Sequence, residues 1–251
     1  MKYCFIILFF PFVAFGQTDY DLYEKGRLEI TKSNPELALE YINKAIQLRP
    51  DYCEYYVTRA IWRMSSLDNM EQSIRQLEIC NKDIDKAIDL GCERIQPYSI
   101  KGFIFKKMGL IEQSKEYYKK ALILLVDTTN YSTYDSRASI KTALGDFNGA
   151  IKDYNKVMFL NKKYGNTLYG LRGFCKEKLK DYRGAISDYT KQIDLNNLSP
   201  GATGEIYFKR GWMKKKLNDT KGACQDWTIA GELGYMTAFN SINAECNGLI
   251  Y

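Results

Sequence analysis

Pairs of small residues recur along this chain at a spacing that few folds produce. In six places a small residue is followed by a second one, twelve residues later in five cases and twenty in the other. The pairs are Gly26 with Ala38, Ala60 with Cys80, Gly102 with Ser114, Ala138 with Ala150, Gly173 with Ala185, and Gly211 with Ala223. Their first members lie 34 to 42 residues apart, which is the period of stacked helical hairpins. The chain is therefore predicted to be a repeat array, an architecture that presents a surface to other molecules.

Each repeat has the same order of aromatic and small positions. In the last repeat, Tyr207 and Gly211 share one face of a first helix. Ala223 and Trp227 share the matching face of a second helix. The small residues would let the two backbones approach, and the aromatic side chains would fill the space beside them. Much of the tyrosine content is thereby predicted to be core.

This pattern resembles the tetratricopeptide repeat over about residues 19–235, and the first repeat also has the closing proline of that family, Pro50. The resemblance implies an all-α fold, a right-handed α-solenoid of about six helical hairpins. The array is expected over 17–235, in repeats at about 19–52, 53–94, 95–130, 131–165, 166–203 and 204–235. The segment 236–251 is expected to form a capping helix and tail that cover the last hairpin.

The start of the chain stands outside the array. Lys2 precedes an apolar run over residues 5–15, and Ala14 and Gly16 have the small side chains of a processing site. The run is too short to cross a membrane, which takes roughly 20 residues. Residues 1–16 are therefore predicted to be a signal peptide, cleaved near Gly16, that exports the chain to the periplasm or the extracellular space. The mature chain would then have no integral membrane segment; an uncleaved anchor is the alternative.

Composition excludes several classes of function. The chain has no histidine, which removes imidazole bases, histidine-activated nucleophiles and histidine metal sites. No two cysteines form a C-x-x-C pair that would favour a thiolate zinc site. The 36 basic and 30 acidic residues alternate along the predicted helices instead of forming a basic stripe. We therefore expect no catalytic residues, no metal, no cofactor and no nucleic-acid partner.

Six of the seven cysteines would remain after cleavage, and export favours disulfides. Cys53 begins the first helix of the second repeat and Cys92 follows its second helix, so these ends are neighbours in an antiparallel hairpin. Cys224 lies in the last second helix and Cys246 in the helix that follows. Cys53 with Cys92 and Cys224 with Cys246 are the expected pairs, although the sequence alone leaves the connectivity open. Cys80 stands at a small buried position, where packing explains it.

A basic residue precedes the small residue of every first helix, where the family pattern prefers leucine. These residues are Lys25, Arg59, Lys101, Arg137, Arg172 and Arg210. In the four arginine repeats the second helix carries an aspartate just before its large residue. The predicted structural ion pairs are Arg59 with Asp83, Arg137 with Asp153, Arg172 with Asp188, and Arg210 with Asp226. A basic ladder that binds a ligand is the alternative.

In the tetratricopeptide family the first helices line a concave groove, so the resemblance places a binding site on their exposed face. The candidate residues combine aromatic and basic side chains: Phe103, Lys106, Phe174, Lys178, Phe208, Trp212 and Lys215. The aromatic rings would anchor apolar side chains of an extended peptide or a helix, and the lysines would bind a carboxylate. The alternative is that some of these rings pack against the next repeat.

The functional hypothesis is a non-enzymatic, monomeric scaffold or adaptor of the bacterial cell envelope, which binds a protein or peptide segment. A self-assembling structural protein is the second hypothesis, which the predicted cap opposes. A hydrolase of envelope polymers is the third, but the acidic residues never form an isolated pair among apolar neighbours. Eight additional residues around Ser65 to Gln72 in the second repeat are interpreted as a neutral elaboration, with a binding loop as the alternative.

Overall fold

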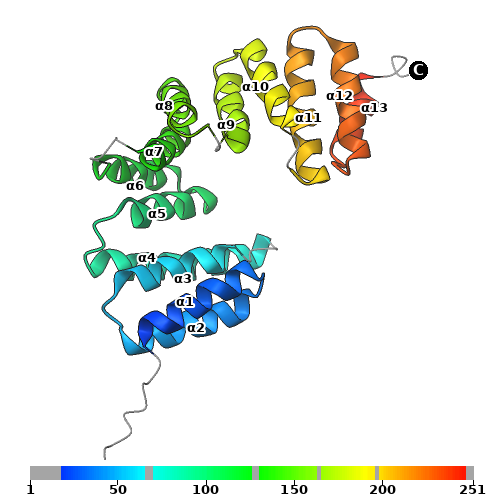
Figure 1. Cartoon of the computed structure of the whole chain (residues 1–251). Coiled ribbons are helices and arrows are strands. Elements are labelled where there is room, and N and C mark those ends of the chain that lie inside the picture. The colour runs from blue at the N-terminus through cyan, green and yellow to red at the C-terminus, as the bar shows by residue number, and fades with distance from the viewer. Residues whose placement is uncertain (1–17, 66–69, 126–129, 163–164, 196–197, 247–251) are drawn as a thin grey trace, which may run out of the picture. The chain divides into compact units, whose positions relative to one another are not determined.

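A computed structural model describes residues 18–65, 70–125, 130–162, 165–195 and 198–246. These residues form thirteen helices and no strand (Figure 1). The predicted signal peptide lies outside the described residues, and so does the middle of the predicted insertion at Ser65 to Gln72. The predicted all-α fold built from helical hairpins is confirmed.

Twelve of the described helices follow one another as six consecutive pairs, one pair for each predicted repeat. The pairs are α1 (Asp19–Thr31) with α2 (Pro35–Leu48), α3 (Cys53–Met64) with α4 (Met70–Asp89), α5 (Ile95–Lys107) with α6 (Ile111–Ile123), α7 (Tyr131–Leu144) with α8 (Phe147–Leu160), α9 (Gly165–Lys178) with α10 (Tyr182–Asp194), and α11 (Pro200–Lys216) with α12 (Thr220–Glu232). The sixth pair begins at Pro200, four residues before the expected boundary, because a proline is well accommodated in the first turn of a helix.

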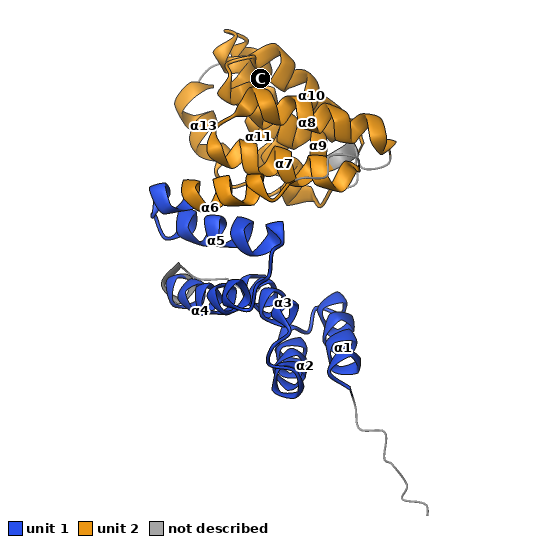
Figure 2. Cartoon of the chain, turned by 90° about the vertical axis from the view of Figure 1, so that its left-hand side faces the viewer, with its two compact units in different colours: residues 1–114 blue, residues 115–251 orange. Residues whose placement is uncertain are grey.

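The chain divides into two compact units, residues 1–114 and residues 115–251, with the boundary inside α6 (Figure 2). Unit 1 holds α1 to α5 and the start of α6. Unit 2 holds the rest of α6 and the helices that follow. Each unit has its own core, with Ile42, Tyr55 and Ile84 buried in unit 1 and Tyr154 and Trp227 buried in unit 2.

The tight turns within the hairpins of unit 2 follow one local rule. A residue with positive φ, namely Gly145, Lys180 or Asn218, ends the first helix. The aspartate that follows it caps the next helix by accepting a backbone N–H, at 2.9 Å in each case; these bonds join Gly149 to Asp146, Gly184 to Asp181, and Gly222 to Asp219. The short capping side chain stops one helix and starts the next within a few residues.

The small residues lie where the two helices of a hairpin meet, as the repeat pattern predicts. Ala38, Ala60, Ala150 and Ala185 are fully buried. At Gly211 an aromatic ring takes the place of a side chain, because an added β-carbon would lie 2.6 Å from Nε1 of Trp227. Such close approach lets the rings fill the interface at the density of a protein interior.

The last helix, α13 (Ala238–Glu245), packs on α12 and contributes to the core of the last hairpin. Ala238 is fully buried, and a disulfide joins Cys224 on α12 to Cys246 directly after α13, with their Cα atoms 5.8 Å apart. Lys215 of α11 pairs with Glu245 at 2.8 Å. A disulfide and an ion pair thus hold this short helix against the last hairpin.

Two glycine substitutions in α11 distinguish the effect of close packing on stability from the effect of helix propensity. Gly211→Ala should lower the free energy of unfolding by about 1–3 kcal/mol, because the buried Trp227 ring has no room to move. Gly201→Ala is the control: no atom lies within 4 Å of its added β-carbon, so it should leave stability unchanged or raise it by up to about 1 kcal/mol. Urea unfolding of both variants measures the difference. Equal effects would contradict the packing described here.

Candidate functional site

Four buried aspartates organise the charged interior of the hairpins. Each accepts two hydrogen bonds from one arginine, through Nε and Nη2, in the four pairs that the sequence suggests. Arg172 reaches Asp188 at 2.9 and 2.5 Å, and Arg210 reaches Asp226 at 2.9 and 2.8 Å. The aspartate side chains are at most 7 % exposed. This bidentate geometry is the strongest form of a carboxylate–guanidinium contact.

Each aspartate also binds a second cation, which the sequence analysis missed. Lys141 reaches Asp153 at 2.8 Å, Lys176 reaches Asp188 at 2.8 Å, and Lys214 reaches Asp226 at 3.0 Å. Arg63 makes the equivalent contact with Asp83. The signal was present in the sequence, because the second base stands four residues after the arginine and therefore on the same face of the helix.

Three of the arginines also bridge to the preceding hairpin through Nη1. Arg59 donates to Asn43 at 2.8 Å, Arg172 donates to Asn155 at 2.6 Å, and Arg210 donates to Thr190 at 3.0 Å. All four guanidinium groups lie 4.9 to 5.5 Å from the ring centre of a tyrosine three residues earlier, at Tyr56, Tyr134, Tyr169 and Tyr207.

The same basic position in the third hairpin also contacts a carboxylate. Lys101, which is 7 % exposed, pairs with Asp85 of α4. The four arginines and Lys101 are thus engaged inside the array.

The candidate binding residues fall in both units. In unit 1, Phe103 and Lys106 lie on α5; Phe103 is 40 % exposed, and the Lys107 ammonium stands 5.6 Å from its ring centre. In unit 2, Phe174 and Lys178 lie on α9. The remaining three, Phe208, Trp212 and Lys215, lie on α11.

The aromatic candidates of unit 2 form two groups. Phe174 is half-buried and meets Phe147 edge-on with ring centres 6.3 Å apart, while the exposed Lys178 places its ammonium 5.0 Å from the Phe174 ring. Phe208 and Trp212 are half-buried and pack against the core of the last hairpin, where the ring centres of Trp212 and Trp227 are 5.0 Å apart. These two rings therefore pack in part against their own hairpin, whereas the alternative interpretation expected packing against the next repeat.

Asp135 adds an acidic group to the first helices of unit 2. It lies on α7, three residues before Ala138, the position that Phe208 occupies before Gly211 on α11. It is half-buried, and burial raises its pKa above the usual range of a carboxyl group. We use "first-helix face of unit 2" for a set of positions on α7, α9 and α11 that lie beside the small residues of these first helices: Asp135, Ser139, Phe174, Lys178, Phe208 and Trp212.

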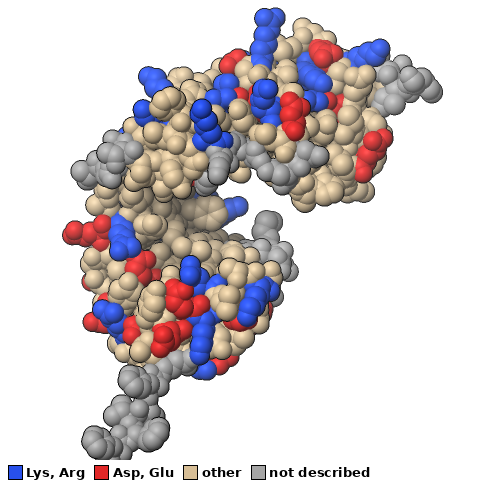
Figure 3. Space-filling view, in the orientation of Figure 1, with Lys and Arg blue, Asp and Glu red and all other residues tan. Residues whose placement is uncertain are grey.

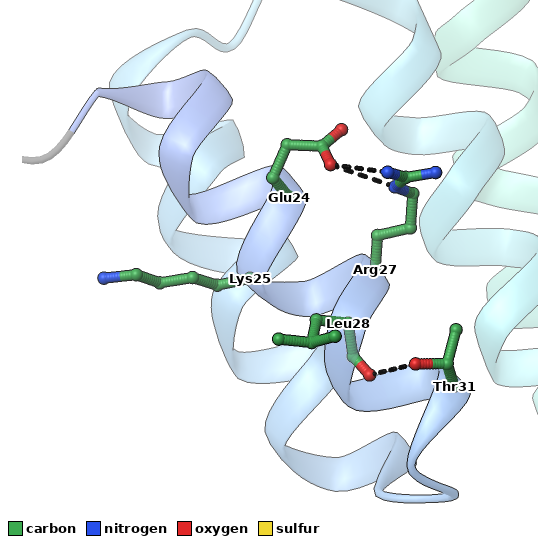
Figure 4. A pocket seen from close by; sticks show the side chains of 5 residues that line it. All are labelled: Glu24, Lys25, Arg27, Leu28 and Thr31. Atoms are coloured by element: carbon green, nitrogen blue, oxygen red, sulfur yellow. Dashed lines mark hydrogen bonds and ion pairs between the residues drawn. The ribbon is translucent and has the colours of Figure 1, made fainter.

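Unit 1 has a surface hollow of about 450 Å³ along α1 (Figure 4). Its described lining consists of Glu24, Lys25, Arg27, Leu28 and Thr31. Glu24 and Arg27 point toward one another and pair at 2.8 Å, and the Arg27 side chain is 65 % exposed. The hollow therefore has the chemistry of a solvated helix face, with Leu28 as its exposed apolar group.

Charge is mixed over the molecular surface. On the face shown in Figure 3, Lys and Arg side chains are interspersed with Asp and Glu in each unit. No helix among the described residues has both the length and the apolar character needed to cross a membrane. Within the same residues, no group of three or more Cys, Asp or Glu side chains is arranged to hold a metal ion.

Comparison with known proteins points to one family. The family model described as "Tetratricopeptide repeat" matches residues 22–52 and 95–122. No curated protein matches the chain.

Solved structures share the fold at low sequence identity. The Cut9–Hcn1 structure of the APC/C superposes with a TM-score of 0.71 at 14 % identity, over 90 % of this chain and 42 % of that one. This chain therefore spans less than half the length of that protein. PilW, described as a type IV pilus biogenesis factor, has a TM-score of 0.68 at 12 % identity, over 89 % and 97 % of the two chains. YrrB, described as a TPR protein with an unusual peptide-binding site, has a TM-score of 0.51 at 17 % identity, over 80 % and 97 %.

The Asp153 carboxylate predicts a defined dependence of stability on pH. Burial opposes ionisation of Asp153, but hydrogen bonds from Arg137 and Lys141 outweigh it and hold the pKa below its ordinary value of 3.8. Because the folded-state pKa is lowered, the stabilisation is fully present above the unfolded-state pKa and is lost as the pH falls through the folded-state pKa.

Urea unfolding of wild type and Asp153→Asn at several pH values checks this dependence. The difference in unfolding free energy between the two proteins should be largest above about pH 5 and should shrink as the pH falls below 3.8. A difference that stays constant over this range would contradict the ionised clamp. Glu205→Gln, which alters an exposed pair with Lys209, is the control and should show little difference at any pH.

Proposed function

Because the chain is a tetratricopeptide repeat protein, we propose that it is a non-enzymatic scaffold that binds a protein or peptide segment on the first-helix face of unit 2. The observation that carries this proposal is a contrast between interior and surface. The buried charges are engaged in clamps that close and join the hairpins, whereas this face carries half-buried rings, the half-buried Asp135 and the exposed Lys178.

The chemistry of this face suits an extended segment with apolar side chains. Phe174 and Trp212 are held by their neighbours, so binding would immobilise little additional side-chain freedom. Half-buried aromatic rings are the usual anchors of protein interfaces. Lys178 and Asp135 provide one charge of each sign, which would fix the direction and register of the segment.

Two of the similar structures support a role of this kind. YrrB is described as having a peptide-binding site, and PilW is described as a factor in pilus biogenesis. The likeness to both concerns the fold, so the present chain's partner is proposed from its own surface.

We further propose that the scaffold works in the bacterial cell envelope or outside the cell. Residues 1–16 have the pattern of a signal peptide, and disulfides join Cys53 to Cys92 and Cys224 to Cys246. Disulfides of this kind persist in oxidising compartments such as the periplasm.

Thiol titration of the protein purified from its native cells checks export and pairing together. After removal of residues 1–16, the denatured, unreduced chain should show two free thiols, Cys80 and Cys175. Reduction should raise this number to six, and amino-terminal sequencing should begin at Gln17. Six thiols before reduction, or an intact Met1, would contradict the proposed location.

The binding proposal is tested by co-purification from the native envelope. The double variant Phe174→Ala with Lys178→Glu removes the half-buried ring and the exposed charge of α9 and leaves the Arg172–Asp188 clamp in place. One specific protein should co-purify with wild type and should be reduced at least roughly tenfold with the double variant.

Lys191→Glu is the matched control, since it makes the same charge change at an exposed position of the second helix α10. It should retain the partner, and circular dichroism should show both variants folded. If the double variant captures the same proteins as wild type in the same amounts, the first-helix face of unit 2 is not the binding site.

A further inference from the structure

The fifth hairpin, α9 with α10, departs from the other five at one buried position. Seven residues after the small residue of each second helix, the other hairpins have an aliphatic residue with no exposed area: Ala45, Ala87, Ala121, Val157 and Ala230. In α10 this position holds Gln192, which is 6 % exposed. A buried amide in place of a methyl group needs both room and hydrogen-bond partners.

Gly170 on α9 provides the space for the Gln192 side chain. This residue lies three positions before Gly173, and the equivalent residues of the other hairpins all carry a side chain: Tyr23, Val57, Ser99, Asp135 and Phe208. A β-carbon added at Gly170 would lie 2.8 Å from Cδ of Gln192, so a side chain there would displace the amide. The Gln192 amide thus fills the space at Gly170 that the other hairpins fill with the side chain of that residue.

The Gln192 amide lacks a hydrogen-bond partner on its oxygen within the described part of the chain. Oε1 of Gln192 is buried and has no hydrogen-bond partner among the described residues. An unpaired buried carbonyl oxygen destabilises the folded state. The packing of a hairpin does not require it, because the other five hairpins pack an aliphatic residue at this position. A costly polar group that packing does not need is a candidate for binding.

We propose that the amide of Gln192 binds a main-chain peptide group of the partner segment where that segment crosses Gly170. A carboxamide can donate and accept a hydrogen bond at once, as a peptide group does. Gly170 is partly exposed and has no side chain that would cover the amide, so a partner backbone that crosses Gly170 can approach the amide closely. This inference rests on the proposed function of the first-helix face of unit 2, and it adds an anchor that is independent of the partner's side chains.

The neighbouring hairpins determine what the same segment would meet on either side of this anchor. Asp135 on α7 and Phe208 on α11 occupy the repeat position of Gly170. A segment that runs across α7, α9 and α11 would therefore meet a carboxylate, an amide and an aromatic ring in order. The expected partner is an extended segment with a basic residue toward α7 and an apolar residue toward α11.

The test uses peptides selected on immobilised wild-type protein from a display library of random sequences and then labelled with fluorescein. Gln192→Met keeps the length of the side chain and removes both hydrogen-bonding groups. The variant should unfold at the same or a higher urea concentration than wild type, because it no longer buries an unpaired oxygen. It should nevertheless bind the selected peptides roughly tenfold more weakly. If Gln192 had only a structural role, its substitution would not weaken peptide binding while the stability of the protein is preserved.

Methylation of single peptide nitrogens identifies the group that Gln192 binds. One N-methylated position should weaken binding to wild type and have no further effect on Gln192→Met, which is the signature of a coupled pair. If alanine at an Asn or Gln of the peptide shows this coupling instead, the amide binds a side chain and the main-chain proposal is wrong.

The failure of this inference can be distinguished from failure of the proposed function. Equal affinity of wild type and Gln192→Met overturns the inference. If binding is still lost in the Phe174→Ala and Lys178→Glu double variant, the proposed function stands. If the double variant binds as wild type does, or if the selection returns no binding peptide, both are overturned.

Discussion

The bidentate contact between an arginine of a first helix and a buried aspartate of a second helix is the interaction on which the array depends. It joins the two helices in four of the six described hairpins, and in three of these four the same guanidinium also binds Asn43, Asn155 or Thr190 of the preceding hairpin. A second base on the same helix compensates the buried charge further. Removing one partner of such a group would leave an uncompensated charge inside the array, so the clamp specifies how hairpins stack as well as how they close.

This arrangement separates structure from recognition. Because the repeated arginines and aspartates bind one another, the chemistry left for a partner lies where a hairpin departs from the repeat. Asp135, Phe174 and Gly170 on the first helices of unit 2, together with Gln192 on the second helix α10, are departures of this kind. A repeat protein can vary such positions without changing its fold, since each hairpin contacts mainly its neighbours.

The fold could be predicted from the sequence because its cause is periodic. The paired small residues predict the hairpins. The aspartates beside the large residues of the second helices predict the partners of the four arginines. The second cations at Lys141, Lys176 and Lys214 are also detectable in the sequence, because each stands four residues after its arginine. The candidate site was less predictable. Its features depend on contacts between different helices, which no local spacing reveals. Three such contacts are Trp212 on Trp227, Lys215 with Glu245, and Gln192 against Gly170.

Site-specific photo-crosslinking in the native cells shows whether a partner binds the first helices of unit 2. A photo-reactive residue would replace Lys178 on α9 in one protein and Arg183 on α10 in another, both at exposed positions. A partner on these first helices should give a discrete crosslinked protein from position 178 and none from position 183. A partner captured at position 183 and not at position 178 would contradict binding to the first helices.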